Sequence, residues 1–280
     1  MSATLSFPFG ADFMQRALVA GLAVGIFAPV IGIFLVQKRL SLIGDGIGHV
    51  AFAGVGAGLL LSVWPIWTAL AFAVVGALGV DWLRARRRVA GDVALALFFY
   101  SGIALGVVLV SLGGGLNANV LTYLFGQPLT VKGSEIAVIL ALGAGITITM
   151  WLLRRSMFAV VTDEDWSRVA GLPVEGLNSL LAVLTAVAVV AAMRIVGILL
   201  VAAMMVLPVA SAQLLARSFR GTLVVAVCVG AGSVVAGLAA SWFWDIAPSG
   251  AMVLAAACVF AILSIVKRTA PRGLRQEEHG

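Results

Sequence analysis

Two side chains that can bind a metal ion, Asp45 and His49, lie four positions apart in a stretch that is otherwise apolar. If this stretch is helical, the carboxylate and the imidazole lie on one face, about 6 Å apart along the helix axis. One oxygen ligand and one nitrogen ligand suit zinc, manganese or ferrous iron. The pair therefore predicts a divalent-metal site. The alternative is that Asp45 caps the helix and His49 hydrogen-bonds a backbone carbonyl.

The surroundings of this pair are those of a membrane protein. Hydrophobic residues make up 62% of the chain and charged residues 11%, which a water-soluble domain could not carry without large exposed apolar patches. The sequence predicts an all-α integral membrane protein of about nine transmembrane helices. The third apolar run has fifteen residues, which cover only about 22 Å as a helix, so we expect it to extend into 81–85. The nine runs are 13–36, 45–63, 66–80, 93–112, 136–153, 177–193, 195–216, 223–242 and 249–266.

The basic residues predict the orientation of the chain. The formal net charge is +6, but the cations are dispersed between the apolar runs, which excludes a nucleic-acid partner. With nine spans and a cytoplasmic carboxy terminus, only Arg16, Lys132 and Arg194 of the eighteen Lys and Arg residues lie outside. This bias follows the positive-inside rule. We therefore expect an external amino terminus and a cytoplasmic tail at 268–280.

Ionisable residues within membrane spans are rare and tend to mark a transport path, which favours the metal interpretation of Asp45 and His49. Two ligands do not complete a coordination shell. A second copy related by a twofold axis would place two carboxylates and two imidazoles around one pore. Small residues four positions apart, such as Gly21 and Gly25, also predict closely packed helices.

A second informative stretch, the 162–174 segment, interrupts the apolar chain on the side predicted to be cytoplasmic. Thr162 can cap a short amphipathic helix, Gly171 can end it, and Pro173 prevents its continuation. The segment is either an ordinary solvated connector or a docking element for a soluble partner. Its candidate coupling residues are Asp163, Glu164, Asp165, Trp166, Val169, Gly171, Leu172 and Pro173.

Other features narrow the function. Pro208 is expected to kink its span and is a possible gate. The chain has no phosphate-binding loop, so ATP would have to be bound by another chain. Cys228 and Cys258 lie in apolar runs and are interpreted as buried small hydrophobes. With two histidines and no convergent nucleophile, the chain is predicted not to be an enzyme.

These residues resemble the permease subunits of the zinc, manganese and iron ABC importers, the ABC-3 family, over nearly the full length. The most specific match is Ser41-Leu-Ile-Gly-Asp45-Gly-Ile-Gly-His49, which is similar to the family's entry to the second span. Leu124-Phe125-Gly126, residues 163–174, and Val196-Gly197-Ile-Leu-Leu-Val201 leading to Pro208 are similar as well. Where relatives often have Pro-Ala-Ala, this chain has Pro208-Val-Ala.

The resemblance implies a fold similar to that of the vitamin B12 importer permease. It implies a homodimer in the bacterial inner membrane, a cytoplasmic ATP-binding subunit and an extracytoplasmic metal-binding protein as partners. It also implies that Asp45 and His49 line the metal path and that residues 163–174 contact the ATPase. No cofactor is expected, because the divalent metal is the transported substrate.

We therefore expect one permease domain over 1–280 that imports a divalent metal by alternating access driven by a partner ATPase. The alternative is an ion-coupled secondary transporter, which would need coupling carboxylates in several spans and usually an inverted repeat, and the sequence shows neither. Oxygen plus nitrogen ligation leaves the choice among zinc, manganese and iron open.

Overall fold

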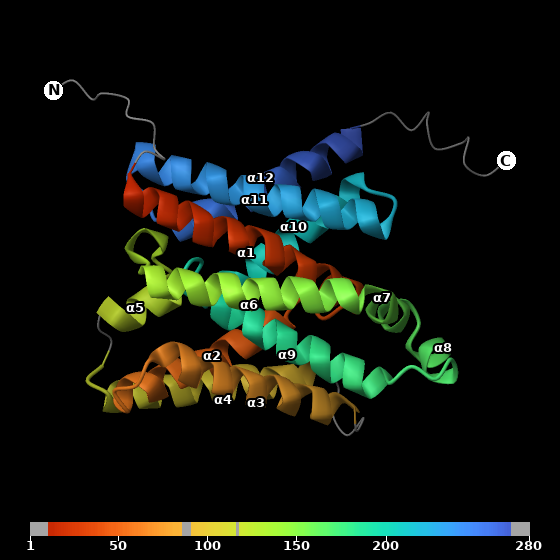
Figure 1. Ribbon diagram of the computed structural model, residues 1–280, viewed down its shortest axis with the longest axis horizontal. Coiled ribbons are helices and arrows are strands. Elements are labelled where there is room, and N and C mark those ends of the chain that lie inside the picture. Colours follow the sequence, from red (N-terminus) through yellow and green to blue (C-terminus); the bar gives the residue numbers. More distant parts are fainter. Residues whose placement is uncertain (1–10, 86–90, 116–117, 270–280) are drawn as a thin grey trace.

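The computed structural model describes residues 11–85, 91–115 and 118–269, and this part of the chain is helical and contains no strand. The predicted tail at 268–280 lies outside the described residues except for its first two, which end the last helix. The helices lie roughly side by side along the long axis of the molecule (Figure 1). They are α1 (Asp12–Gln37), α2 (Ile43–Leu60), α3 (Pro65–Ala85), α4 (Gly91–Leu112), α5 (Ala118–Phe125), η2 (Pro128–Thr130), α6 (Gly133–Leu152), α7 (Arg154–Thr162), α8 (Glu164–Val169), α9 (Val174–Ala192), α10 (Val201–Leu215), α11 (Phe219–Trp244) and α12 (Pro248–Thr269).

Eight helices of the described part are long and apolar enough to cross a membrane, namely α1, α2, α3, α4, α6, α9, α11 and α12. They confirm the all-α, multi-pass membrane class. The weak third run is lengthened as expected, because α3 continues through Asp81 to Ala85. Its last turn thus brings charged side chains to the end of the span.

The prediction that the seventh apolar run, 195–216, crosses the membrane as one helix is wrong. The structure has turns over 193–200 and a helix, α10, only from Val201 to Leu215. Fifteen helical residues cover about 22 Å, too short for about 30 Å of hydrocarbon. The apolar run at 195–216 is therefore divided into an irregular half and a helical half.

The chain nevertheless passes from one end of the bundle to the other in this region. At one end, the 193–200 stretch is hydrogen-bonded to α5 through Ile198 N–H, which donates to the Tyr123 carbonyl at 3.0 Å. At the other end, Lys267 Nζ near the end of α12 donates to the Leu214 carbonyl at 3.1 Å. The ninth passage is therefore made by an irregular segment followed by a short helix.

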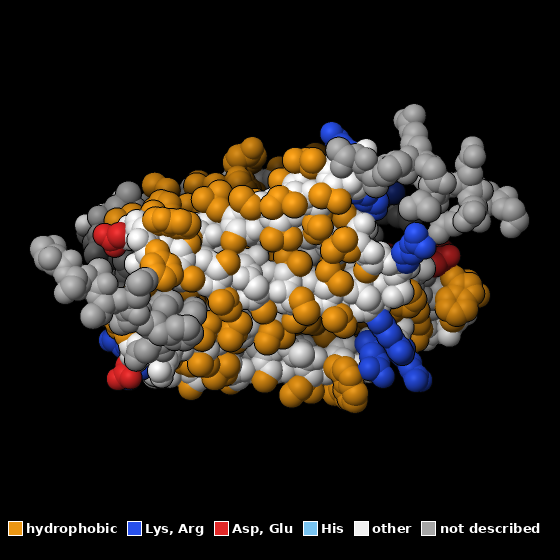
Figure 2. Space-filling view, turned by 90° about the horizontal axis from the view of Figure 1, so that it is seen from above, with side chains coloured by type: hydrophobic (Ala, Val, Ile, Leu, Met, Phe, Trp, Pro, Cys, Tyr) orange, Lys and Arg blue, Asp and Glu red, His pale blue; other side chains and the backbone are white. Residues whose placement is uncertain are grey.

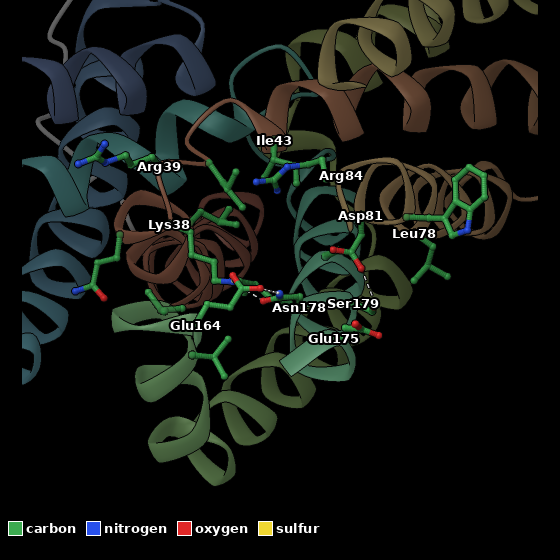
Figure 3. Close-up of a pocket in the computed structure, with 18 of the residues that line it drawn as sticks. Lys38, Arg39, Ile43, Leu78, Asp81, Arg84, Glu164, Glu175, Asn178 and Ser179 are labelled. Carbon is green, nitrogen blue, oxygen red and sulfur yellow. Dashed lines mark hydrogen bonds and ion pairs between the residues drawn. The ribbon is translucent and has the colours of Figure 1, made fainter. Parts of the chain in front are cut away.

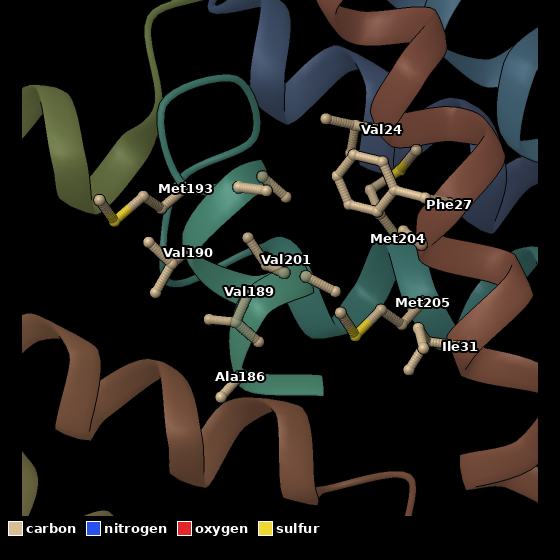
Figure 4. Close-up of a cluster of buried hydrophobic side chains, with 14 of the residues drawn as sticks. Val24, Phe27, Ile31, Ala186, Val189, Val190, Met193, Val201, Met204 and Met205 are labelled. Carbon is tan, nitrogen blue, oxygen red and sulfur yellow. The ribbon is translucent and has the colours of Figure 1, made fainter. Parts of the chain in front are cut away.

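The core is formed mainly by α1, α2 and α9. More than 60% of the best membrane-spanning window of each is buried within the protein, against 33% or less for α3, α4, α6, α11 and α12. Figure 4 shows α1, α9 and α10 meeting through Phe27, Val189 and Met204. All three of these side chains are buried. Apolar side chains of the outer helices, which include Tyr100 and Leu254, are exposed as expected for surfaces that face lipid.

Glycines allow the central helices to approach at backbone distance, as the small-residue pattern predicted. A Cβ added to Gly32 of α1 would lie 2.0 Å from the Met205 carbonyl oxygen of α10. One added to Gly230 of α11 would lie 2.4 Å from the Gly25 carbonyl oxygen. Such contacts let helix backbones pack where lipid supplies no hydrophobic driving force between helices.

The charged residues gather at the ends of the molecule, and most of the Lys and Arg side chains visible in Figure 2 lie at one end. That end carries α7 and α8 in Figure 1. Between the two ends, the visible surface is covered largely by apolar side chains (Figure 2). This distribution is the one expected for a protein whose middle zone lies in hydrocarbon.

The Gly32 contact leads to a stability prediction. We expect Gly32→Ala to destabilise the purified protein by about 1–3 kcal/mol, since the new methyl group overlaps the backbone of α10. The measurement is thermal unfolding in detergent.

Gly145→Ala on α6 is the matched control, because a Cβ at Gly145 meets no atom within 4 Å. Both changes replace a glycine inside a helix by alanine, so the difference between them isolates the steric term. Equal melting temperatures for the two variants would contradict the close approach of α1 and α10.

Candidate functional site

Asp45 lies in the first turn of α2 and is half-buried. The N-cap residue of this helix is Leu42, and no side chain accepts a capping hydrogen bond. The alternative interpretation of Asp45 as a helix cap is therefore wrong.

His49 lies one turn further along α2, on the same face as Asp45 because the two residues are four positions apart. Its ring packs edge-on against Phe99 of α4, with ring centroids 4.3 Å apart. Within the described part of the chain, the side chains of His49 and Asp45 form no hydrogen bond or ion pair with another residue. Two ionisable side chains thus share one face of a transmembrane helix with their polar atoms uncommitted.

Glycines allow two neighbouring elements, α4 and the irregular stretch before α10, to pack closely against this part of α2. Gly48, one position before His49, faces Ile198 in the irregular stretch, and a Cβ there would meet its side chain at 3.4 Å. On the other side, a Cβ added to Gly102 of α4 would lie 2.9 Å from the His49 carbonyl carbon. Asp45 and His49 therefore lie on the part of α2 that is bordered by α4 and by the stretch leading into α10.

One copy of the chain does not supply a complete metal shell. Among the described residues, no group of three or more His, Cys, Asp or Glu side chains is placed to hold a metal ion. If Asp45 and His49 bind a metal ion, they need further ligands from water, backbone or another chain.

The 162–174 segment forms the expected short helix, but its cap differs from the prediction. Thr162 ends α7, and its hydroxyl donates to the Phe158 carbonyl at 2.8 Å. Asp163 is the cap of α8 and accepts from Trp166 N–H at 2.8 Å. A carboxylate at this position both satisfies a free N–H group and interacts favourably with the helix dipole.

The end of α8 follows the prediction. Gly171 has a positive φ of 80°, which a residue with a side chain rarely adopts. Leu172 N–H donates to the Ser167 carbonyl at 3.0 Å and Gly171 N–H to the Arg168 carbonyl at 3.2 Å, a Schellman ending. Pro173 then precedes α9 as its N-cap residue. Local signals in the sequence therefore specify the length of this helix.

Two apolar side chains of α8 project from the protein. Trp166 is 62% exposed and Val169 89% exposed. Leu172, the third apolar residue predicted to face a partner, instead packs against the hydrophobic core. An exposed Trp and Val on a short helix at the charged end of the bundle are typical of a surface that another chain covers.

A cavity of about 920 Å³ lies beside α8, between the end of α1, the start of α2, α3 and α9 (Figure 3). Lys38 Nζ donates to Asn178 Oδ1 and lies 3.5 Å from Glu164 Oε2. Asn178 Nδ2 in turn donates to Glu164 Oε1 at 3.1 Å. On the α3 wall, Ser179 Oγ donates to Asp81 Oδ2 at 2.5 Å.

Burial lowers the pKa of the Lys38 amine, and the nearby Glu164 carboxylate opposes that effect. Desolvation disfavours the charged form of an amine, whereas an adjacent carboxylate favours it. The Glu164 carboxylate therefore offsets part of the cost of placing Lys38 in this wall.

At the opposite end of the bundle, a buried ion pair holds the irregular stretch. Arg194 Nε and Nη2 lie 2.9 and 3.0 Å from the two carboxylate oxygens of Glu135 at the start of α6. The guanidinium also lies over the Tyr123 ring of α5, 5.1 Å from its centroid. Two side chains whose sequence positions gave no sign of pairing thus connect α5, α6 and the end of α9.

Two motifs that were noted separately in the sequence pack against each other here. A Cβ added to Gly126, which follows Leu124 and Phe125, would lie 2.6 Å from Gly197 N. Both glycines have positive φ, 72° and 89°. The backbone contact between them requires glycine on both sides, which explains why both motifs contain one.

Pro208 lies inside α10 and is buried. Met205, one turn earlier, faces Gly44 in the first turn of α2. Pro208 is therefore located one turn of α10 beyond the contact with the helix that carries Asp45.

Sequence reasoning missed Lys38 and Asn178 as partners of the 162–174 segment. The only signal was that the span after Pro173 begins with several polar residues, Asn178 among them. It also missed the Glu135 and Arg194 pair, for which the signal was an acid at the edge of one apolar run and a base between two others.

The fold is that of a helical, multi-pass membrane protein with an exposed helix at its charged end and the ionisable pair Asp45 and His49 in its second span. The chain belongs to the ABC 3 transport family, whose family profile matches residues 10–267. This assignment confirms the resemblance found in the sequence.

The chain is 32% identical to the manganese transport system membrane protein MntC of Halalkalibacterium halodurans, over 90% of this chain and 86% of that protein. It is 27% identical to the high-affinity zinc uptake system membrane protein ZnuB of Haemophilus influenzae, over 92% and 98%. Among solved structures, it matches PsaBC from Streptococcus pneumoniae in complex with Fab with a TM-score of 0.83 and 29% identity, covering 91% of each chain.

The buried ion pair leads to a second stability prediction. Arg194 and Glu135 have side chains only 11% and 8% exposed. Removing one partner leaves the other charge buried and unpaired, so we expect Arg194→Gln to lower the free energy of unfolding by about 3–5 kcal/mol. The measurement is thermal or denaturant unfolding of the purified protein.

The double variant Arg194→Met with Glu135→Met is the control. It removes both charges together, and we expect it to be more stable than Arg194→Gln. If the double variant were at least as unstable as the single one, the pair would not account for the stability of this region.

Proposed function

We propose that this chain is the permease subunit of an ABC importer that carries a divalent transition metal into the cytoplasm. A partner ATPase drives the movement by hydrolysing ATP, and this chain provides the path. The main support is the pair Asp45 and His49, half-buried on one face of α2 without a partner among the described residues. Family membership and the relatives that are named for manganese and zinc support the class of substrate.

The metal path needs a second copy in this proposal. A twofold dimer provides two carboxylates and two imidazoles around one axis, which is a sufficient ligand set for zinc, manganese or ferrous iron. The partial exposure of both residues in one chain supports this arrangement, because a path enclosed within one bundle would bury them. Pro208, one turn from the contact of α10 with α2, is the candidate gate.

The 162–174 segment is the proposed docking site for the cytoplasmic ATP-binding subunit. Trp166 and Val169 provide the exposed apolar contact, and the acids Asp163, Glu164 and Asp165 start the helix. Gly171, Leu172 and Pro173 fix its end against α9. This assignment makes the end with α7 and α8 cytoplasmic, with the amino terminus outside and the 268–280 tail inside.

The remaining parts of the proposal follow from this assignment. The whole of 1–280 acts as one permease domain surrounded by lipid in the bacterial inner membrane. An extracytoplasmic metal-binding protein delivers the ion at the end with α5. The metal itself is assigned by reconstituting the complex and comparing zinc, manganese and ferrous iron for stimulated ATP hydrolysis and for uptake.

Metal uptake by variants of the pair tests the central claim. We expect Asp45→Asn and His49→Ala to reduce ATP-dependent uptake into proteoliposomes by about tenfold or more, because each loses a charge-assisted contact of about 1.5–3 kcal/mol to the ion. Uptake is measured at equal permease density.

Asp245→Asn is the matched control for this test. It is the same chemical change at an exposed residue with a positive φ of 52°, which Asn adopts readily. Normal uptake by Asp45→Asn and His49→Ala would refute the metal path.

Docking of the ATPase is tested through α8. We expect Trp166→Ala to weaken association with the ATP-binding subunit by about 2 kcal/mol or more, the effect of removing a large aromatic anchor from an interface. The measurement is the affinity of the purified permease for its ATPase in detergent or nanodiscs.

Trp244→Ala at the opposite end of the bundle is the control, since that side chain is 73% exposed but lies far from α8 along the molecule. We expect it to leave the affinity unchanged. Equal affinity for wild type and Trp166→Ala would exclude α8 as the docking element.

A further inference from the structure

The short helix α8 is attached to the rest of the protein mainly by polar contacts. Ser167 is its one buried residue within the helix Glu164–Val169. Glu164, in the first turn, is bonded to Lys38, which follows α1, and to Asn178, in the second turn of α9. Lys38 also donates to Asn178, so the three side chains close a triangle (Figure 3).

Lys38 is joined rigidly to the helix that carries Asp45. Lys38 N–H donates to the Phe34 carbonyl at 3.1 Å and Leu40 N–H to the Leu35 carbonyl at 2.8 Å. Ile43 N–H then donates to the Leu40 carbonyl at 3.0 Å at the start of α2. Backbone hydrogen bonds therefore connect α1 and α2 through a tight turn, and Asp45 follows two residues after Ile43.

The cavity separates this triangle from the opposite wall. Figure 3 shows Lys38, Glu164 and Asn178 together on one side, and Asp81, Arg84 and Leu78 on the side of α3. This space is not filled by side chains, so it leaves room for Lys38 and Glu164 to shift together. The triangle is thus a direct connection between α8 and the turn that leads into α2, and Ser179, next to Asn178, bonds the α9 corner of the triangle to Asp81 of α3.

We infer that Lys38, Glu164 and Asn178 form the mechanical link that carries movement of α8 to the turn between α1 and α2, and so to Asp45. Lys38 and Glu164 act here as positioning residues that do not contact the metal. This inference rests on the proposed function, in which α8 docks on the ATPase. It differs from that proposal because docking concerns the exposed face of α8, whereas the link lies on the face turned toward the bundle.

The exposed fractions of the Lys38 and Glu164 side chains support the assignment of one residue to the bundle and the other to α8. The Lys38 side chain is 12% exposed and belongs to the bundle, whereas that of Glu164 is 44% exposed and belongs to the outer helix. An ammonium group held in the wall of a bundle stays close to a carboxylate that can offset its desolvation. Lys38 therefore follows Glu164 when α8 moves, and α2 follows Lys38.

The test uses the permease reconstituted with its ATPase and measures two quantities, ATP hydrolysis and metal uptake. We expect Lys38→Met, which lies outside the docking segment, to bind the ATPase and hydrolyse ATP, but to lower the number of ions taken up per ATP by about fivefold or more, the usual scale of a lost coupling between sites. We expect Glu164→Gln to lower the same ratio. The charge reversal Lys38→Glu with Glu164→Lys restores an ion pair across the same gap. We expect it to recover most of the ratio.

Two matched controls lie in the same cavity. Arg84→Gln and Glu175→Gln each remove one charge from its lining, but at positions outside the triangle. We expect both to keep the wild-type ratio of uptake to hydrolysis. A general effect of cavity charge would lower the ratio in the controls as well, and that result would overturn the link.

The outcomes separate the link from the proposed function. If the wild-type complex shows no ATP-dependent uptake of zinc, manganese or iron, the proposed function fails. If the wild type transports and the single variants keep its ratio, the link is wrong while the function stands. The link is also wrong if Lys38→Met loses ATPase binding or if charge reversal restores nothing.

Discussion

The structure depends on one constraint, the absence of water in the hydrocarbon zone. Every backbone polar group and every ionisable side chain in that zone has to find a partner within the protein. Long helices meet the requirement for the backbone without help. The informative places are those where the chain leaves a helix or carries a charge, because a specific partner must then be provided.

The described part of the chain meets this requirement at nearly every such place. The irregular stretch at 193–200 is hydrogen-bonded to α5, and Gly126 and Gly197 allow the two backbones to touch. Arg194 is held by Glu135, and Lys38 by Glu164 together with a neighbouring amide. Asp45 and His49 differ from these residues because their polar atoms have no partner among the described residues. This contrast is the physical reason to look for their partner in a transported ion or a second chain.

The parts of the fold that could be predicted from sequence are those set by local signals. Hydropathy and length located the spans, the shortness of the third run predicted the extension of α3, and Gly171 with Pro173 predicted the end of α8. The spacing of Asp45 and His49 correctly predicted that they share one face, because residues four positions apart in an α-helix always do. Thr162 and Asp163 are adjacent and both can cap a helix, so sequence did not decide which of them ends α7 and which begins α8.

The parts that could not be predicted depend on distant contacts. The 195–216 run carries no charge, and only its packing against α5 shows why the first part is not helical. Lys38 and Asn178 are 140 positions apart, and Glu135 and Arg194 are 59 apart. In a single sequence, nothing about one member of such a pair indicates which residue it will contact. Pairing of charges across a bundle is therefore known only once the helices have been placed.

The position of α10 explains how a displacement at one end of the bundle can alter the surroundings of Asp45. Its first turns contact α1 at Gly32 backbone to backbone, and they contact α2 at Gly44 through the side chains of Ala202 and Met205. A shift of the turn between α1 and α2 cannot be absorbed by side-chain rearrangement at Gly32, so α1 would have to move as a body relative to α10. Closely packed interfaces of this kind change between discrete arrangements and do not deform gradually. Arg194 and α5 hold the irregular start of this short helix, so α10 is suited to remain in place while α1 and α2 move past it.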